Sequence, residues 1–79
     1  MFKKGKYKTL VGNLTVFRNM YETDIIKKKG TTIDIVEVEE DPKGKVRGFF
    51  KDGSYIIMRS YTGMITVEAV KTPKKGGTR

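Results

Sequence analysis

The 79-residue sequence has no cysteine, no histidine and no tryptophan. Without cysteine there is neither a disulfide framework nor a thiolate metal site. Without histidine, the commonest general base and the commonest metal ligand are both missing. The acidic residues lack the spacing of a calcium loop, and no glycine-rich phosphate loop is present. The composition therefore predicts a protein that is not an enzyme and that holds no metal or cofactor.

The sequence also lacks a long apolar run. Its start, Met1 to Lys4, is basic but is not followed by the apolar core of a signal peptide. No stretch is long and apolar enough for a membrane-spanning helix. We therefore expect a cytoplasmic protein without a membrane span, and a chain of this length predicts a single domain with a small core.

The net charge of +8 is concentrated at the two ends of the chain. Residues 1–8 contain Lys3, Lys4, Lys6 and Lys8, and residues 71–79 contain Lys71, Lys74, Lys75 and Arg79, with no acid in either segment. The residues between them hold nine basic and nine acidic side chains. We therefore predict a basic N-terminal arm (residues 1–6), a small β-barrel domain (residues 7–71) that is neutral apart from Lys8 and Lys71 at its ends, and a flexible basic tail (residues 72–79).

The apolar residues follow the period of two that is typical of β-strands. Five or six strands are predicted, at about residues 7–11, 14–17, 31–39, 45–51, 54–60 and 64–70. The alternation changes phase at Ile35-Val36, which predicts a β-bulge or a sharp bend. Residues 18–29 have no clear period, so we expect a long loop there, with no more than a single helical turn near Glu22–Ile26.

Strong turn signals separate the later strands. Asp41-Pro42-Lys43-Gly44 predicts a tight turn, and Asp52-Gly53 predicts a type I′ hairpin turn. Short strands joined in this way predict an all-β fold that curls into a small barrel or packs as a two-sheet sandwich, and we expect the small barrel. The predicted core consists of Leu10, Leu14, Val16, Ile26, Ile33, Ile35, Val38, Val46, Phe50, Ile56, Met58, Ile65 and Val67.

The stretch from Asn13 to Val38 resembles the first half of bacterial Src-homology-3-like domains. It reads Leu14-Thr15-Val16-Phe17-Arg18, then a polar loop, the pair Ile25-Ile26, the basic turn Lys28-Lys29-Gly30 and an alternating strand. The hairpin around Asp52-Gly53 extends the resemblance to about residue 67. The resemblance implies a five- to six-stranded barrel and a non-catalytic binding role. It also implies a cell-wall ligand as one alternative, although those modules use tryptophan and a secretion signal.

The charges of two neighbouring segments are segregated. Residues 34–41 contain five acids and no base, and residues 43–51 contain four bases and no acid. Because the turn at Asp41–Gly44 makes these segments antiparallel neighbours, we expect ion pairs across them.

The candidate binding residues of the domain are Phe17, Arg18, Tyr21, Arg47 and Phe49, which combine aromatic rings with basic side chains. Such a combination suits a protein hot spot or the stacking of nucleic-acid bases. Two structural alternatives remain, namely a second small core under the loop at residues 18–29 and a homodimer that buries Phe49.

These observations favour a binding module that docks on a protein or nucleoprotein partner, with the basic ends supplying electrostatic attraction. A phage or mobile-element accessory protein that modulates host machinery fits this size and composition. The alternative is a nucleic-acid-binding barrel that uses the basic ends, among them Lys74, Lys75 and Arg79, together with the aromatic residues.

Overall fold

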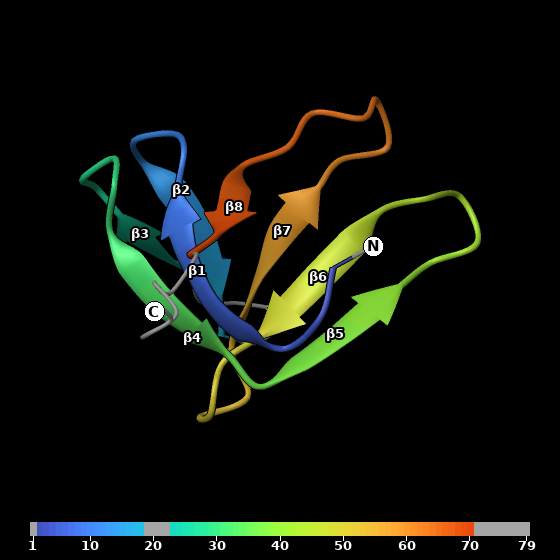
Figure 1. The fold of residues 1–79 in the computed structure, drawn as a ribbon, viewed down its shortest axis with the longest axis horizontal. Coiled ribbons are helices and arrows are strands. Elements are labelled where there is room, and N and C mark those ends of the chain that lie inside the picture. The colour runs from blue at the N-terminus through green and yellow to red at the C-terminus, as the bar shows by residue number, and fades with distance from the viewer. Residues whose placement is uncertain (1, 19–22, 71–79) are drawn as a thin grey trace, which may run out of the picture.

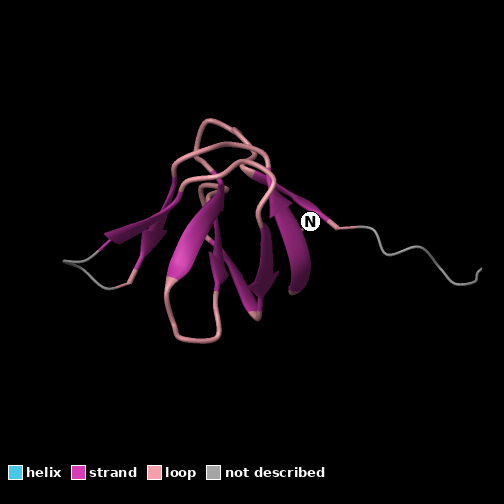
Figure 2. Ribbon diagram, turned by 90° about the vertical axis from the view of Figure 1, so that its left-hand side faces the viewer, coloured by secondary structure: helices cyan, strands magenta, loops and turns pink. Residues whose placement is uncertain are grey.

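The computed structural model describes residues 2–18 and 23–70, and within these ranges the protein is all-β with no helix (Figures 1 and 2). The strands are β1 (Gly5–Thr9), β2 (Leu14–Phe17), β3 (Thr23–Ile26), β4 (Thr32–Ile35), β5 (Glu37–Glu40), β6 (Val46–Phe49), β7 (Tyr55–Arg59) and β8 (Val67–Ala69). The all-β prediction is confirmed, but the described residues form eight strands instead of five or six. Within the same ranges, no helix has the length and apolar character needed to span a bilayer.

The strands form two antiparallel sheets. The smaller sheet has the order β4-β1-β8, and the larger has the order β3-β2-β7-β6-β5. The sheets pack against each other and enclose one core between their inner faces (Figure 1). The hydrogen-bonded strands do not close into the single barrel that the sequence predicted, since the pairing divides them into two sheets.

A β-bulge at Val36 divides the predicted strand at residues 31–39 into β4 and β5. The backbone N–H of Val36 donates to the carbonyl of Phe49 (2.8 Å), while Glu37 is the register partner of that same residue. Two residues therefore oppose one, which bends the chain from the smaller sheet into the larger. The phase change seen at Ile35-Val36 in the sequence is confirmed as this bulge.

Residues 23–26 form an edge strand, β3, where the sequence predicted a loop or a helical turn. β3 pairs antiparallel with β2 from Leu14↔Ile26 to Phe17↔Thr23. Thr23, Asp24 and Ile25 are all exposed, and Ile26 alone packs against the core, so the strand is held mainly by its backbone pairing with β2. A strand with a single partly buried residue has no alternation in its sequence, and the prediction was wrong for this reason.

Three tight turns share one geometry. In each turn a glycine N–H donates to the carbonyl three residues earlier, as in Gly44 to Asp41 (2.9 Å), Gly53 to Phe50 (3.0 Å) and Gly63 to Ser60 (2.9 Å). The three glycines have φ of 91° to 95°, a conformation that other residues adopt only with strain. The turn predicted at Asp41–Gly44 is confirmed. The type I′ turn at Asp52-Gly53 was wrong, because the only non-glycine with positive φ among the described residues is Asn13.

The core lies between the two sheets. Its buried members are Tyr7, Leu14, Val16, Ile33, Ile35, Val46, Ile56, Met58 and Val67, with Phe2, Val11, Ile26, Val38 and Phe50 packed against them. Two predicted core residues are misplaced, since Leu10 is only half-buried and lies outside this cluster, and Ile65 is 39% exposed. Ile65 precedes β8, and the neighbouring Thr66 is buried in its place by donating its hydroxyl to the carbonyl of Ile57 (2.7 Å).

Candidate binding surface

Three aromatic rings lie side by side on the outer face of the larger sheet, and we call Phe17, Tyr55 and Phe49 the aromatic row. Tyr55 is the register partner of Phe17 on one side and of Phe49 on the other. The ring centroids are 5.2 Å apart between Phe17 and Tyr55 and 5.3 Å apart between Phe49 and Tyr55. All three are half-buried and alternate along their strands with buried residues. The row therefore faces away from the core.

Arg47 adds a positive charge to this row. Its guanidinium carbon lies 5.7 Å from the centre of the Tyr55 ring, within the range of a cation–π contact. Its Nη1 also binds Oε1 of Glu39, the opposite residue on β5, at 3.1 Å. The structure thus brings together three residues of the predicted site, Phe17, Arg47 and Phe49.

Tyr55 completes the aromatic row and was missed in the sequence. The sequence did contain a signal for Tyr55. Ile56 was predicted to face the core, and the residue before it on a strand must then point outward. The apolar surface continues beyond the row into a groove of about 430 Å³ whose lining includes Thr15, Ile57 and Met64. Met64 is 55% exposed at this groove. A second small core under the loop at residues 18–29 was one alternative. Of that segment, the described residues 23–26 form β3, which lies beside β2 in the sheet and not over the row.

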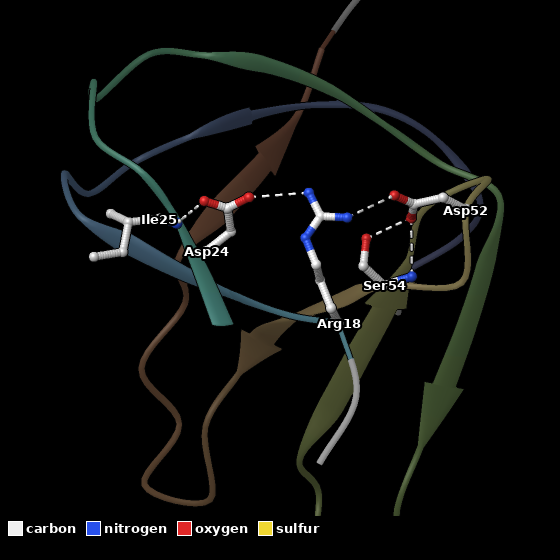
Figure 3. A network of polar contacts seen from close by, with 5 residues as sticks. All are labelled: Arg18, Asp24, Ile25, Asp52 and Ser54. Atoms are coloured by element: carbon white, nitrogen blue, oxygen red, sulfur yellow. Dashed lines mark hydrogen bonds and ion pairs between the residues drawn. The ribbon is translucent and has the colours of Figure 1, made fainter. Parts of the chain in front are cut away.

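Arg18, the residue after Phe17, joins two separate hairpins (Figure 3). Its Nη2 lies 2.9 Å from Oδ2 of Asp24 on β3, and its Nη1 lies 3.5 Å from Oδ2 of Asp52 in the β6–β7 turn. Asp52 in turn accepts hydrogen bonds at Oδ1 from the N–H (2.9 Å) and the hydroxyl (2.5 Å) of Ser54. This network fixes the edge hairpin to the turn between β6 and β7.

The same contacts keep both carboxylates ionised. The pKa of Asp24 lies below its ordinary value, mainly because Arg18 donates a hydrogen bond to it and secondarily because the N–H of Ile25 does. The pKa of Asp52 is also lowered, first by the hydrogen bonds from Ser54 and then by the charge of Arg18. The guanidinium of Arg18 therefore faces two carboxylates that remain charged at neutral pH.

Only one ion pair forms between the acidic and basic segments around the Asp41–Gly44 turn. β5 and β6 pair antiparallel as predicted, but among the described residues Glu39 and Arg47 alone make a salt bridge across them. Glu37 faces Phe49, and Glu40 faces Val46. The remaining carboxylates of β5 are exposed at the open edge of the larger sheet.

The N-terminal lysines divide into two pairs. Lys6 and Lys8 lie in β1, where they contact Asp34 (3.0 Å) and Glu68 (3.7 Å) on the neighbouring strands. Lys3 and Lys4 are exposed and make no ion pair with any described residue. Because β1 begins at Gly5, Lys6 belongs to the sheet and not to an arm.

Val70, the last described residue, lies beside β1. The N–H of Val70 donates to the carbonyl of Lys6 (3.0 Å), so the two charged ends of the chain begin next to each other. The predicted site residues Tyr21, Lys74, Lys75 and Arg79 lie outside the described residues.

No group of three or more acidic side chains in residues 2–18 and 23–70 is arranged to hold a metal ion. Comparison with known proteins gives no further guidance on the site. No protein-family model, curated protein or solved structure matches the chain.

Proposed function

We propose that this protein is a non-enzymatic binding module that docks on a protein partner through the outer face of the larger sheet. The observation that carries the proposal is the aromatic row, which stands outside the core with Arg47 stacked on its central ring. Aromatic residues and arginine are the residues most enriched in protein-interaction hot spots. The adjoining groove with Met64 enlarges the apolar area available to a partner.

The charges around the row favour a protein over a nucleic acid at this face. Arg18 faces Asp24 and Asp52, and Arg47 faces Glu39, so both arginines are engaged by carboxylates of the same chain. A nucleic acid would have to break these pairs or approach the exposed acids of β5, and both are unfavourable for a polyanion. A protein surface with apolar side chains could contact the row without breaking these ion pairs and without approaching those acids.

We further propose that the two sheets are the two halves of a Src-homology-3-like fold. The bulge at Val36 lets the chain pass from β4 in the smaller sheet directly into β5 in the larger. The β2–β3 hairpin lies between β1 and β4 in the sequence, although β1 and β4 are neighbours in the smaller sheet. Arg59 forms an isolated bridge with Ile65, and Thr66 N–H donates to the Met58 carbonyl at 3.1 Å, which connects the end of β7 to the start of β8. These links support a partly open barrel, a fold that supports binding without catalysis.

The test compares proteins captured from cell extract by the wild type, by Phe17→Gln and by Phe49→Gln. Tyr61→Gln is the matched control, because Tyr61 is an exposed aromatic residue (53%) outside the row. We expect a specific set of proteins to be lost with both row variants and retained with the control, after thermal melts have shown that all four chains are folded. Equal capture by the wild type and the row variants would rule out the aromatic row as the docking site.

A further inference from the structure

A cluster of three consecutive lysines lies at the far end of β1 from the N-terminal lysines. Lys27, Lys28 and Lys29 form the turn between β3 and β4, and all three are exposed without an ion pair to any described residue. The turn is fixed to Thr9, the last residue of β1. Thr9 N–H donates to the carbonyl of Thr31 (2.9 Å), Gly30 N–H donates to the carbonyl of Thr9 (2.8 Å), and the Thr9 hydroxyl donates to the carbonyl of Lys28 (3.3 Å).

Two more lysines are held at the other end of β1. The hydroxyl of Tyr7 donates to the carbonyl of Lys3 (2.5 Å) and accepts from its N–H (3.0 Å). The ring of Phe2 packs against the ring of Tyr7 with centroids 5.9 Å apart. Lys3 and Lys4 therefore extend from a segment that is anchored to the domain.

Lysines thus occupy both ends and the outer side of one strand. Because Tyr7 and Thr9 point into the core, Lys6 and Lys8 point outward between the two end clusters. We define the basic side as these seven lysines together with the two carboxylates that they contact, Asp34 and Glu68. Seven positive and two negative charges give this side a formal net charge of +5.

The rest of the molecule does not share this excess. The described residues outside the basic side carry six bases and six acids, a net charge of zero. The whole net charge of the described residues, +5, therefore lies on the basic side. Four more bases, Lys71, Lys74, Lys75 and Arg79, follow in the sequence and lie outside the described residues.

We propose that the basic side binds the phosphate backbone of nucleic acid without reading its sequence. Lysine ammonium groups act as point charges toward phosphate and release condensed counterions, which gives affinity independent of sequence. The aromatic row lies on the outer face of the opposite sheet, so bases cannot stack on it while phosphates contact the lysines. We therefore expect binding to both single- and double-stranded nucleic acid, with the steeper salt dependence for the duplex, whose charge density is higher.

The surroundings of these lysines favour nucleic acid over a membrane. The register partners of Lys6 and Lys8 on the neighbouring strands are Asp34, Thr32 and Glu68, which are polar. A peripheral membrane surface combines basic residues with apolar side chains that enter the lipid. The apolar side chain that lies beside Lys8, Thr32 and Glu68 on this face is Val70, which is 39% exposed. One such side chain is far less than the continuous apolar face with which an amphipathic element enters lipid.

The test measures the affinity of the full chain for a mixed-sequence DNA of about 20 nucleotides, single-stranded and as a duplex, over a series of NaCl concentrations. We expect binding to both forms at low salt, with log K falling linearly with log salt. The triple variant Lys27→Gln, Lys28→Gln and Lys29→Gln should reduce the duplex salt slope by about 2 to 3 and weaken binding at low salt by about tenfold or more.

The matched control removes the same charge from the rest of the molecule, by Lys43→Gln, Lys45→Gln and Lys51→Gln. We expect this control to change the slope by less than about 1, the equivalent of a single phosphate contact. Equal losses in the two triple variants would overturn the proposal, because they would reflect net charge and not a surface. Absence of wild-type binding at low salt, or binding to anionic lipid vesicles but not to DNA, would also overturn it.

This inference does not rest on the proposed protein-docking function, and the same experiment separates the two. Phe49→Gln should keep the affinity and the salt slope of the wild type. If Phe49→Gln instead abolishes DNA binding while the lysine variant does not, the nucleic acid binds at the aromatic row and the basic side is not its site.

Discussion

Gly48 is a residue that the core requires for reasons of space. It lies on the inner face of β6, where a Cβ atom would run into the Sδ and Cγ atoms of Met58 and would lie 3.0 Å from the Cδ1 atom of Ile35. Its φ is not positive, so any residue could adopt its backbone conformation. The restriction arises from the two side chains that already fill the site.

Gly48→Ala should therefore lower the free energy of unfolding by about 1 to 3 kcal/mol, the usual range for overpacking a core. Chemical denaturation of the wild type and the variant measures this loss. Because Met58 makes the closest contact, the same substitution should cost less in a Met58→Ala background. An equal cost in both backgrounds would show that the loss is not caused by contact with Met58.

The carboxylates of Asp24 and Asp52 make stability depend on acid pH. Contacts with Arg18 and Ser54 hold the pKa of both groups below the ordinary value of 3.8 in the folded protein. The unfolded chain therefore binds protons more readily, and the contribution of these groups is present above that value and lost as the pH falls through the lower folded pKa.

Thermal melts from about pH 5 to about pH 2 should show this loss, and Asp52→Asn should reduce it. Glu40→Gln is a suitable control, because Glu40 has neither an ion pair nor a side-chain hydrogen bond to any described residue. A fall in Tm over this range that is the same in Asp52→Asn as in the wild type would contradict the assignment.

At the scale of elements, the segment before β1 depends on one hydroxyl group. The hydroxyl of Tyr7 satisfies both the N–H and the carbonyl of Lys3. Tyr7→Phe removes both hydrogen bonds and keeps the buried ring, so it should cost about 1 to 2 kcal/mol and release the segment. Trypsin should then cleave after Lys3 and Lys4 faster than in the wild type, while cleavage after Lys51 keeps its rate. Unchanged cleavage after Lys3 and Lys4 would show that the hydroxyl does not hold the segment.

The elements that could be predicted are those whose side chains alternate between core and solvent. The strand at residues 31–39, its phase change at Ile35-Val36 and the Asp41–Gly44 turn all follow from such local signals. β3 could not be found in this way, because three of its four residues are exposed and only Ile26 packs against the core. Ile65 was wrongly assigned to the core because the sequence predicted that Ile65 and Val67 face the same side. In the structure Thr66 and Val67 are both buried and Ile65 is exposed, so the alternation does not extend to Ile65.

The same limit applies to the candidate binding surfaces. Phe17, Phe49 and Arg47 could be assigned to one outer face from their neighbours in the core, but the contact between them runs through Tyr55. Lys27, Lys28 and Lys29 could be seen in the sequence only as part of a turn. Their position at the end of β1 depends on hydrogen bonds to Thr9 and on the pairing of β1 with β4. These contacts join residues that are far apart in the sequence, so the charge cluster could not be predicted from local patterns.

At the scale of the whole molecule, the chain separates its charge into two sides. Counting along the sequence gives a neutral middle with two basic ends, since residues 9–70 hold equal numbers of acids and bases. The fold redistributes these charges, because it brings Lys27, Lys28 and Lys29 to the strand that also carries Lys6 and Lys8. The acids that balance them lie mainly on and around the larger sheet, with Glu37, Glu39 and Glu40 on its edge strand.

Such a separation has a thermodynamic cost that salt should relieve. Like charges on the basic side repel one another over distances comparable to the Debye length, which shortens from about 30 Å at 0.01 M to about 8 Å at 0.15 M. We therefore expect the Tm at neutral pH to rise as NaCl is increased from about 0.01 M to about 0.15 M, although the same salt weakens binding to nucleic acid.

Deleting residues 72–79, which removes Lys74, Lys75 and Arg79, should reduce this rise in Tm, and so should the Gln substitutions at residues 27–29. The Gln substitutions at Lys43, Lys45 and Lys51 remove the same charge and should not reduce it, because these lysines belong to the part of the described chain where acids and bases are equal in number. An equal effect of all three changes would mean that repulsion is spread evenly over the molecule and that its charge is not divided between two sides.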